Sequence, residues 1–110
     1  MVKISKAMEP PEYLRPKTKK WFKEVVQNYM LESHHIKLLT LCCEALDTAE
    51  TAREEILEHG AFYKDRYENP RANPAINVAR DSMTIAARLI RELNLDTEPP
   101  KEAGRPPGLG

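Results

Sequence analysis

Residues 33–60, SHHIKLLTLCCEALDTAETAREEILEHG, decide the fold of this chain. The stretch holds no proline, and its one glycine is its last residue. Ser33 can cap a helix by accepting a hydrogen bond from an exposed backbone N–H. Gly60 is the residue type that most easily adopts the positive φ that ends one. We therefore predict a helix from about His34 to His59, roughly 38 Å long at a rise of 1.5 Å per residue.

This long helix carries two apolar stripes. The first consists of Ile36, Leu39, Cys43 and Leu46, and the second of Leu38, Leu41, Ala45, Ala49, Ala52 and Ile56. One stripe is enough to bury a surface helix against its own domain. Two stripes in a domain of this size favour a second partner, most simply another copy of the chain. The second stripe, rich in alanine, is therefore our candidate interface for a homo-oligomer.

The segments around the long helix complete an all-α prediction. A first helix is expected from Pro16, since proline suits the first helical position, to about Met30. Residues 61–69 alternate aromatic and polar side chains, which indicates a short β-hairpin. Asn73-Pro74 then favours a cap and start for a third helix reaching Leu93. Ile76, Ala79, Met83, Ala86, Ile90 and Leu93 line one face of this helix, and Val78, Ile85 and Leu89 widen that face.

The predicted organisation is a helical hairpin plus a third long helix, with a short β-hairpin insertion and flexible termini. A flexible arm over 1–13 precedes a helical core domain over 14–95, and a flexible tail rich in proline and glycine follows over 96–110. At 110 residues the chain has room for one modest core. We find no signal peptide and no apolar run approaching ~20 residues. The expected location is the cytoplasm, with Cys42 and Cys43 reduced.

No pattern for catalysis, metal or cofactor binding is found, so we expect neither an enzyme nor a cofactor. The histidines lie at opposite ends of the long helix, without the convergence that zinc needs. Cys42 and Cys43 have apolar or acidic neighbours, which favours core packing over a reactive thiolate. The acids of the long helix spread along a solvated face. A phosphate-binding loop is absent.

The formal net charge is zero, but the charges are segregated. Residues 1–24 hold seven Lys/Arg and three acids, whereas residues 25–69 hold four and nine. A basic N-terminal third is compatible with contact to DNA phosphates, and equally with a solvated lysine face. The candidate DNA-binding residues are Lys3, Lys6, Arg15, Lys17, Lys19, Lys20 and Lys23. A second candidate is the polar face of the third helix with Arg80, Arg88 and Arg91. A helix-turn-helix that inserts the second helix into the major groove is disfavoured, because that helix holds most of the acid.

A series of short runs spans roughly residues 13–107. In order they are Trp21-Phe22-x-x-Val25-Val26, Leu31-x-x-x-His35-x-x-Leu38-Leu39, the Glu54-Glu55-Ile56-Leu57 before Gly60, Asp65-Arg66-Tyr67, Asn73-Pro74-Ala75, Ala79-Arg80-Asp81-Ser82, Ala87-Arg88-Leu89-Ile90-Arg91-Glu92-Leu93, Leu95-Asp96 and Arg105-Pro106-Pro107. Their order and spacing resemble the P27-type family of phage terminase small subunits. Two departures from that family are Glu68-Asn69, where a glycine turn is usual, and Arg15, where a serine cap is common.

The resemblance implies a helical fold with a small hairpin that assembles into a ring. It also implies binding to double-stranded phage DNA in the bacterial cytoplasm, with no membrane contact. The ring would recruit and regulate a large terminase subunit, which carries the ATPase and the nuclease. Separately, and from its expected mobility alone, the tail over 96–110 is our candidate segment for docking the large subunit or the capsid machinery. The main alternative is a helical protein-protein adaptor or regulator that never binds DNA. An enzyme is the third possibility.

Overall fold

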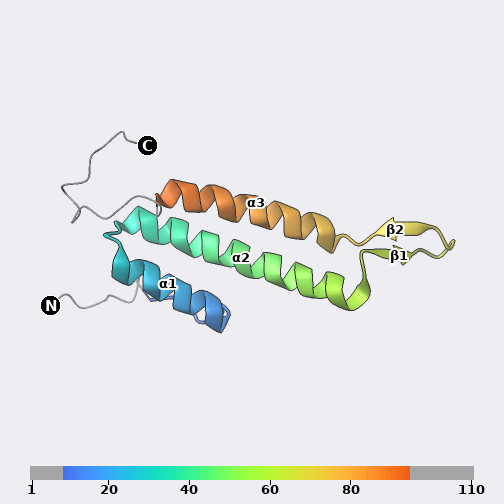
Figure 1. The fold of residues 1–110 in the computed structure, drawn as a ribbon, viewed down its shortest axis with the longest axis horizontal. Coiled ribbons are helices and arrows are strands. Elements are labelled where there is room, and N and C mark those ends of the chain that lie inside the picture. The colour runs from blue at the N-terminus through green and yellow to red at the C-terminus, as the bar shows by residue number, and fades with distance from the viewer. Residues whose placement is uncertain (1–8, 95–110) are drawn as a thin grey trace, which may run out of the picture.

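The computed structural model describes residues 9–94 as three helices and one β-hairpin (Figure 1). The elements are α1 (Pro16–Asn28), α2 (Ser33–His59), β1 (Phe62–Lys64), β2 (Pro70–Ala72) and α3 (Ala75–Leu93). The prediction of an all-α fold with a short hairpin between the second and third helices is confirmed. The predicted flexible tail over 96–110 and residues 1–8 of the predicted arm fall outside the described residues, whereas residues 9–13 of the arm are described. Within residues 9–94, no helix is long and apolar enough to cross a membrane.

Helix α2 is the centre of the molecule, with α1 packed on one side and α3 on the other (Figure 1). The two adjacent cysteines show how one helix serves both neighbours. Cys42 lies against α3, with its Sγ 3.7 Å from the carbonyl oxygen of Ala86. Cys43 belongs to the cluster that includes Phe22 and Val25 of α1. Because successive helical residues point about 100° apart, α2 presents apolar side chains to two different helices of the same chain.

The core between α1 and α2 is small and closed. Phe22 and Leu39 are completely buried, and Leu14, Val25 and Ile36 surround them. Leu93 from the end of α3 joins the same cluster, so all three helices meet at one end of the molecule. Helix α1 starts at Pro16 as predicted, but it ends at Asn28 instead of about Met30. Tyr29 already has an extended backbone, although its side chain still packs against the core cluster, and Met30 is 85% exposed.

Asp47 of α2 fixes the start of α1. One carboxylate oxygen accepts a hydrogen bond from the backbone N–H of Arg15 at 2.8 Å, and the other accepts one from the hydroxyl of the buried Thr18. Helix α1 has no side-chain cap of its own. Asp47 therefore satisfies a backbone donor that would otherwise be unpaired at the helix N-terminus.

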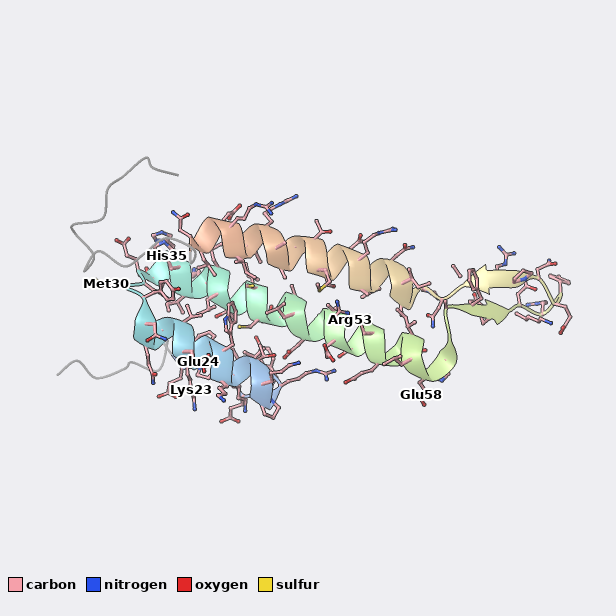
Figure 2. The ribbon with its side chains drawn as sticks, in the orientation of Figure 1. Lys23, Glu24, Met30, His35, Arg53 and Glu58 are labelled. Carbon is pink, nitrogen blue, oxygen red and sulfur yellow. The ribbon has the colours of Figure 1, made fainter. Side chains whose placement is uncertain are left out.

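We expect Asp47→Ala to lower the free energy of unfolding by about 1–3 kcal/mol, because it removes the acceptor of two hydrogen bonds and leaves the Thr18 hydroxyl buried without its partner. Urea denaturation measures this loss. Glu58→Ala is the matched control, since Glu58 is an exposed acid near the end of the same helix (Figure 2). Equal stability of the two variants would show that Asp47 does not hold α1.

The ends of α2 differ in part from the prediction. Ser33 is the first helical residue and not the cap; the cap is Glu32, whose backbone N–H donates to Nδ1 of His35 at 3.0 Å. The side chain of His35 thus takes part in capping the helix, which the sequence analysis did not predict. At the other end Gly60 has φ of +88°, and its N–H donates to the carbonyl of Ile56 at 2.7 Å. Gly60 ends the helix as predicted.

The hairpin lies slightly later than the predicted 61–69. Its strands pair antiparallel with Phe62 opposite Ala72 and Lys64 opposite Pro70, so the turn comprises residues 65–69. Asp65 organises this turn, because its side chain accepts hydrogen bonds from the backbone N–H groups of Tyr67 and Asn69 and from the Arg71 guanidinium. These bonds lower the pKa of Asp65. Glu68 takes φ of +66°, the left-handed conformation that a glycine usually supplies.

Asn73 joins the hairpin to α3. Its Oδ1 accepts the N–H of Ala75 at 3.0 Å, and its Nδ2 donates to the carbonyl of Gly60 at 2.9 Å. The predicted hydrogen bond from the start of the helix to the Asn73 side chain is present, but the helix begins at Ala75 with Pro74 at the cap position instead of in the first turn. The same side chain also ties the end of α2 to the start of α3. This double contact fixes the direction in which the hairpin projects beyond the helices (Figure 1).

Candidate nucleic-acid and assembly surfaces

Four lysines give α1 a basic outer surface. Lys17, Lys20 and Lys23 are exposed and Lys19 is half-buried. Lys23 lies on the side of α1 away from α2 (Figure 2). None of the four forms an ion pair with another residue in the range 9–94. Their charges are therefore not neutralised by carboxylates of the described part of the chain, which is the condition for attracting phosphates.

Arg15 differs from these lysines, because the structure engages it within the protein. Its guanidinium donates to Glu54 at 2.7 and 3.0 Å and to the hydroxyl of Thr51 at 2.6 Å. This two-pronged contact raises the pKa of Arg15 and lowers that of Glu54. Arg15 thus connects α1 to α2, and part of its charge is compensated. Lys3 and Lys6, also predicted as DNA contacts, lie outside the described residues.

The second predicted basic patch lies along α3. Taking the buried Ala86 as the direction of α2, the 100° step per residue puts Arg80, Arg88 and Arg91 on the opposite side of the helix. Arg80 donates to the side chain of Asn77 at 2.7 Å. Arg88 and Arg91 are exposed, and neither forms an ion pair inside the described part of α1 to α3.

The two basic patches lie on opposite edges of the protein. Helix α2 lies between α1 and α3 (Figure 1). The three arginines of α3 and Lys23 of α1 lie on the sides that face away from α2 (Figure 2), whereas Lys17 lies beside α2. A single straight duplex lying against one edge of a protomer does not reach the other edge. The two patches, which the sequence offered as equal candidates, are therefore alternative DNA-binding surfaces, and variants of each patch can distinguish them.

The acids of α2 are used structurally at several positions. Asp47 and Glu54 hold α1, and Glu55 lies 2.7 Å from Nδ1 of His59. Across residues 9–94, no three His, Cys, Asp or Glu side chains come together in a way that could hold a metal ion. Cys42 and Cys43 are both free and fully buried, as the sequence analysis predicted for core residues.

The predicted oligomer stripe on α2 does not stay together as one exposed surface. Ala49 and Ala52 are 2% and 4% exposed within the single protomer. Leu38, Ala45 and Ile56 are half-buried. Leu41 alone of the six is exposed, at 52%. An interface between copies that uses this region must therefore centre on Leu41 and on neighbouring residues of other elements.

Such neighbours exist on α3. Val78 and Ile85 are 44% and 49% exposed, although the sequence placed both on a widened core face of the third helix. On the other side of the α2–α3 pair, a groove of about 490 Å³ opens between α1 and α3. Its apolar lining residues are Trp21, Leu46, Ala49, Met83 and Ile90.

The hairpin adds a third exposed apolar feature. Phe62, Tyr63 and Tyr67 are 67%, 50% and 72% exposed, and the Arg66 guanidinium lies 5.8 Å from the centre of the Tyr67 ring. Exposed aromatic side chains of this kind are enriched at protein interfaces. The alternation of residues 61–69 predicted the hairpin but not that all of its aromatic side chains would point into solvent.

The fold and these surfaces define a small helical protein with two basic edges, two apolar faces and a projecting aromatic hairpin. Residues 18–104, more than half of the chain, match the family described as "Phage terminase, small subunit". The chain therefore belongs to the phage terminase small subunits, a family that acts in phage DNA packaging. No curated protein and no solved structure matches it significantly.

Proposed function

We propose that this protein binds phage DNA as a ring-like homo-oligomer and recruits and regulates the large ATPase-nuclease subunit of the packaging machine. The family membership supports the role in packaging. The observation that carries the DNA contact is the set of α1 lysines, which have no carboxylate partner among the described residues. An oligomer would repeat this basic edge once per protomer, so that weak individual contacts combine through avidity.

In this proposal the protein has no catalytic role and needs no cofactor. It works in the cytoplasm of the bacterial host, and the tail over 96–110 is the segment that docks the large subunit. The P27-type subdivision of the family remains a prediction from the runs of residues described above. Co-purification with a large terminase subunit, with and without residues 96–110, tests the docking.

The DNA contact is tested by charge reversal on the α1 edge. We expect Lys19→Glu, Lys20→Glu and Lys23→Glu together to weaken duplex binding by about 100-fold or more, because three phosphate contacts become repulsive. The slope of log affinity against log salt should also fall by about 1 for each lysine removed from a phosphate. Lys17 is left unchanged because it also lines the groove.

The matched control reverses Arg80, Arg88 and Arg91 on the opposite edge. It changes the net charge of the protein by the same amount, so a loss specific to the lysine variant is a local effect. If the lysine variant binds as tightly as the wild type and the arginine variant does not, DNA lies along α3. Equal, modest losses in both would indicate an effect of net charge alone.

The second candidate function is a protein-protein adaptor that does not bind DNA. The exposed aromatic side chains of the hairpin favour it, because they suit a protein partner better than a phosphate backbone. Measuring the affinity of the wild-type protein for duplex DNA distinguishes the two functions. An adaptor shows no salt-dependent affinity for duplex DNA even at low ionic strength.

A further inference from the structure

The α2–α3 pair has two broad faces. Both carry exposed apolar side chains, but one face forms a groove and the other a ridge. The hydrogen bond from Cys42 to Ala86 marks where the two helices touch. From that line, the 100° step per residue directs Leu46 and Met83 to one face and Leu41 and Ile85 to the other. The lining of the groove confirms the first direction, since Leu46 and Met83 both belong to it.

The first face is concave. The groove is lined by apolar side chains from all three helices, with Trp21 contributed by α1 and Ile90 by α3. Two exposed cations, Lys17 and Arg53, stand at this groove. Figure 2 shows Arg53 at the boundary between α2 and α3, where its guanidinium lies 3.7 Å from the sulfur of Met83. Within residues 9–94 neither cation is paired with a carboxylate.

The second face is a ridge. Leu41, Val78 and Ile85 are about half exposed, and Leu89 adjoins Ile85 one helical turn further on. Because Cys42 contacts Ala86 and the two helices run in opposite directions, Leu41 and Ile85 are offset by only about 3 Å along the helix axes. Asp81 and Glu92 flank this ridge on α3, and both are exposed. Neither forms an ion pair in the described part of the chain.

We propose that the ridge formed by Leu41, Val78, Ile85 and Leu89 of one protomer docks in the groove of a second copy of the same chain. This inference rests on the self-association proposed above and names its surfaces. The occupant is argued from complementarity. The groove is apolar, and its lining holds three cations, Arg15, Lys17 and Arg53, against two carboxylates, Asp47 and Glu50. The ridge is apolar and has the carboxylates of Asp81 and Glu92 beside it, so an apolar ridge bearing carboxylates would meet an apolar groove with an excess of positive charge.

The geometry has a consequence for the assembly. A ridge and a groove on opposite faces make a head-to-tail contact, which leaves a free groove at one end and a free ridge at the other. Contacts of this kind propagate until the chain of protomers closes into a ring or continues as a filament. Lys17 is the only lysine of α1 that borders the contact, whereas Lys19, Lys20 and Lys23 and the arginine edge of α3 take no part in it. In a closed ring, the two edges therefore lie on different surfaces of the ring.

The test introduces a charge on each face separately. We expect Ile85→Asp on the ridge and Met83→Glu in the groove each to convert the wild-type multimer to a monomer of 12.6 kDa in light scattering at micromolar concentration. Both side chains are at least 40% exposed, so the substitutions spare the core. Thr84→Asp is the matched control, because it adds the same charge to the outer edge of α3 and should leave the multimer intact. Far-UV circular dichroism confirms that each variant keeps its helices.

Mixing the two variants gives the decisive result. Ile85→Asp keeps a working groove and Met83→Glu keeps a working ridge, so an equimolar mixture should form dimers of twice 12.6 kDa and nothing larger. A symmetric ridge-to-ridge interface gives a different outcome, with Met83→Glu alone remaining multimeric, and overturns the proposal. A wild-type multimer unaffected by Ile85→Asp refutes this interface but not self-association. A monomeric wild type refutes the self-association itself.

Discussion

Replacing Phe22 by alanine is expected to lower the free energy of unfolding by about 3–5 kcal/mol, the range for truncating a buried phenylalanine. Phe22 is completely buried and is the largest side chain in the cluster between α1 and α2. Domains of this size are stable by only about 5–15 kcal/mol. The variant therefore loses a large part of the total, and urea denaturation measures how much.

The consequence for function follows from what α1 provides. This helix carries the lysine edge and, through Trp21, one wall of the groove. Trp21 is the only tryptophan of the chain, so its fluorescence reports on α1, whereas circular dichroism reports on all three helices. In Phe22→Ala we expect the fluorescence transition to precede the circular dichroism transition, because α2 and α3 pack against each other more extensively than α2 and α1 do.

Val26→Ala is the control for this variant, since Val26 is a half-buried side chain at the edge of the same cluster. Its loss should be clearly smaller than that of Phe22→Ala. If Phe22→Ala lost less than about 1 kcal/mol, the packing of α1 on α2 would contribute little to stability.

Local sequence rules located most of the helix ends. The helix ends at Pro16, Gly60 and Asn73 follow from the conformational preferences of these residue types themselves. A reading of neighbouring residues in the sequence therefore finds them. The cap at Glu32 escaped this reading because it depends on a histidine ring three residues later. The sequence also placed the hairpin turn at Glu68-Asn69, and the turn contains both residues. The role of Asp65 at its start escaped the reading, because Asp65 bonds to three partners that only the folded turn brings together.

The partners of the apolar stripes were not predictable in the same way. A helical wheel shows which residues share a face, but it does not say which helix covers that face. The alanines of α2 were assigned to another copy of the chain, whereas Ala49 and Ala52 are buried within the protomer. The exposed ridge on α3 was missed for the converse reason. Val78 and Ile85 continue an apolar face that is wider than α2 can cover.

The candidate DNA surface shows the same limit. The lysine cluster of α1 is visible in the sequence because its members are close together. Arg15, by contrast, pairs with Glu54 instead of adding to the lysine surface. This contact joins residues 39 positions apart, so the sequence does not reveal it. The separation of the lysine and arginine patches onto opposite edges likewise follows from the central position of α2, which no local spacing encodes.

The buried cysteine pair makes the stability of the fold sensitive to alkaline pH. Burial raises the pKa of Cys42 from about 9 to about 11, and burial together with the neighbouring Cys42, Asp47 and Glu44 raises that of Cys43 to about 12. In the unfolded chain both thiols ionise near their ordinary pKa. Above pH 9 the unfolded state therefore releases protons that the folded state retains, and the folded state becomes less stable as the pH rises.

We expect the full thiol contribution below pH 8 and a loss of roughly 1.4 kcal/mol per thiol for each pH unit above 9, until the folded pKa values are reached. Denaturation at several pH values measures the slope. Cys42→Ala/Cys43→Ala should start from a lower stability at pH 7 but show a much shallower decline above pH 9. The phenol of Tyr13 also has a raised pKa, because it donates a hydrogen bond to Glu44. Tyr13→Phe is therefore the control, since it removes the titration of this phenol and leaves both thiols in place. An unchanged slope in the double alanine variant would mean that the cysteines are accessible to solvent, contrary to their position between α1, α2 and α3.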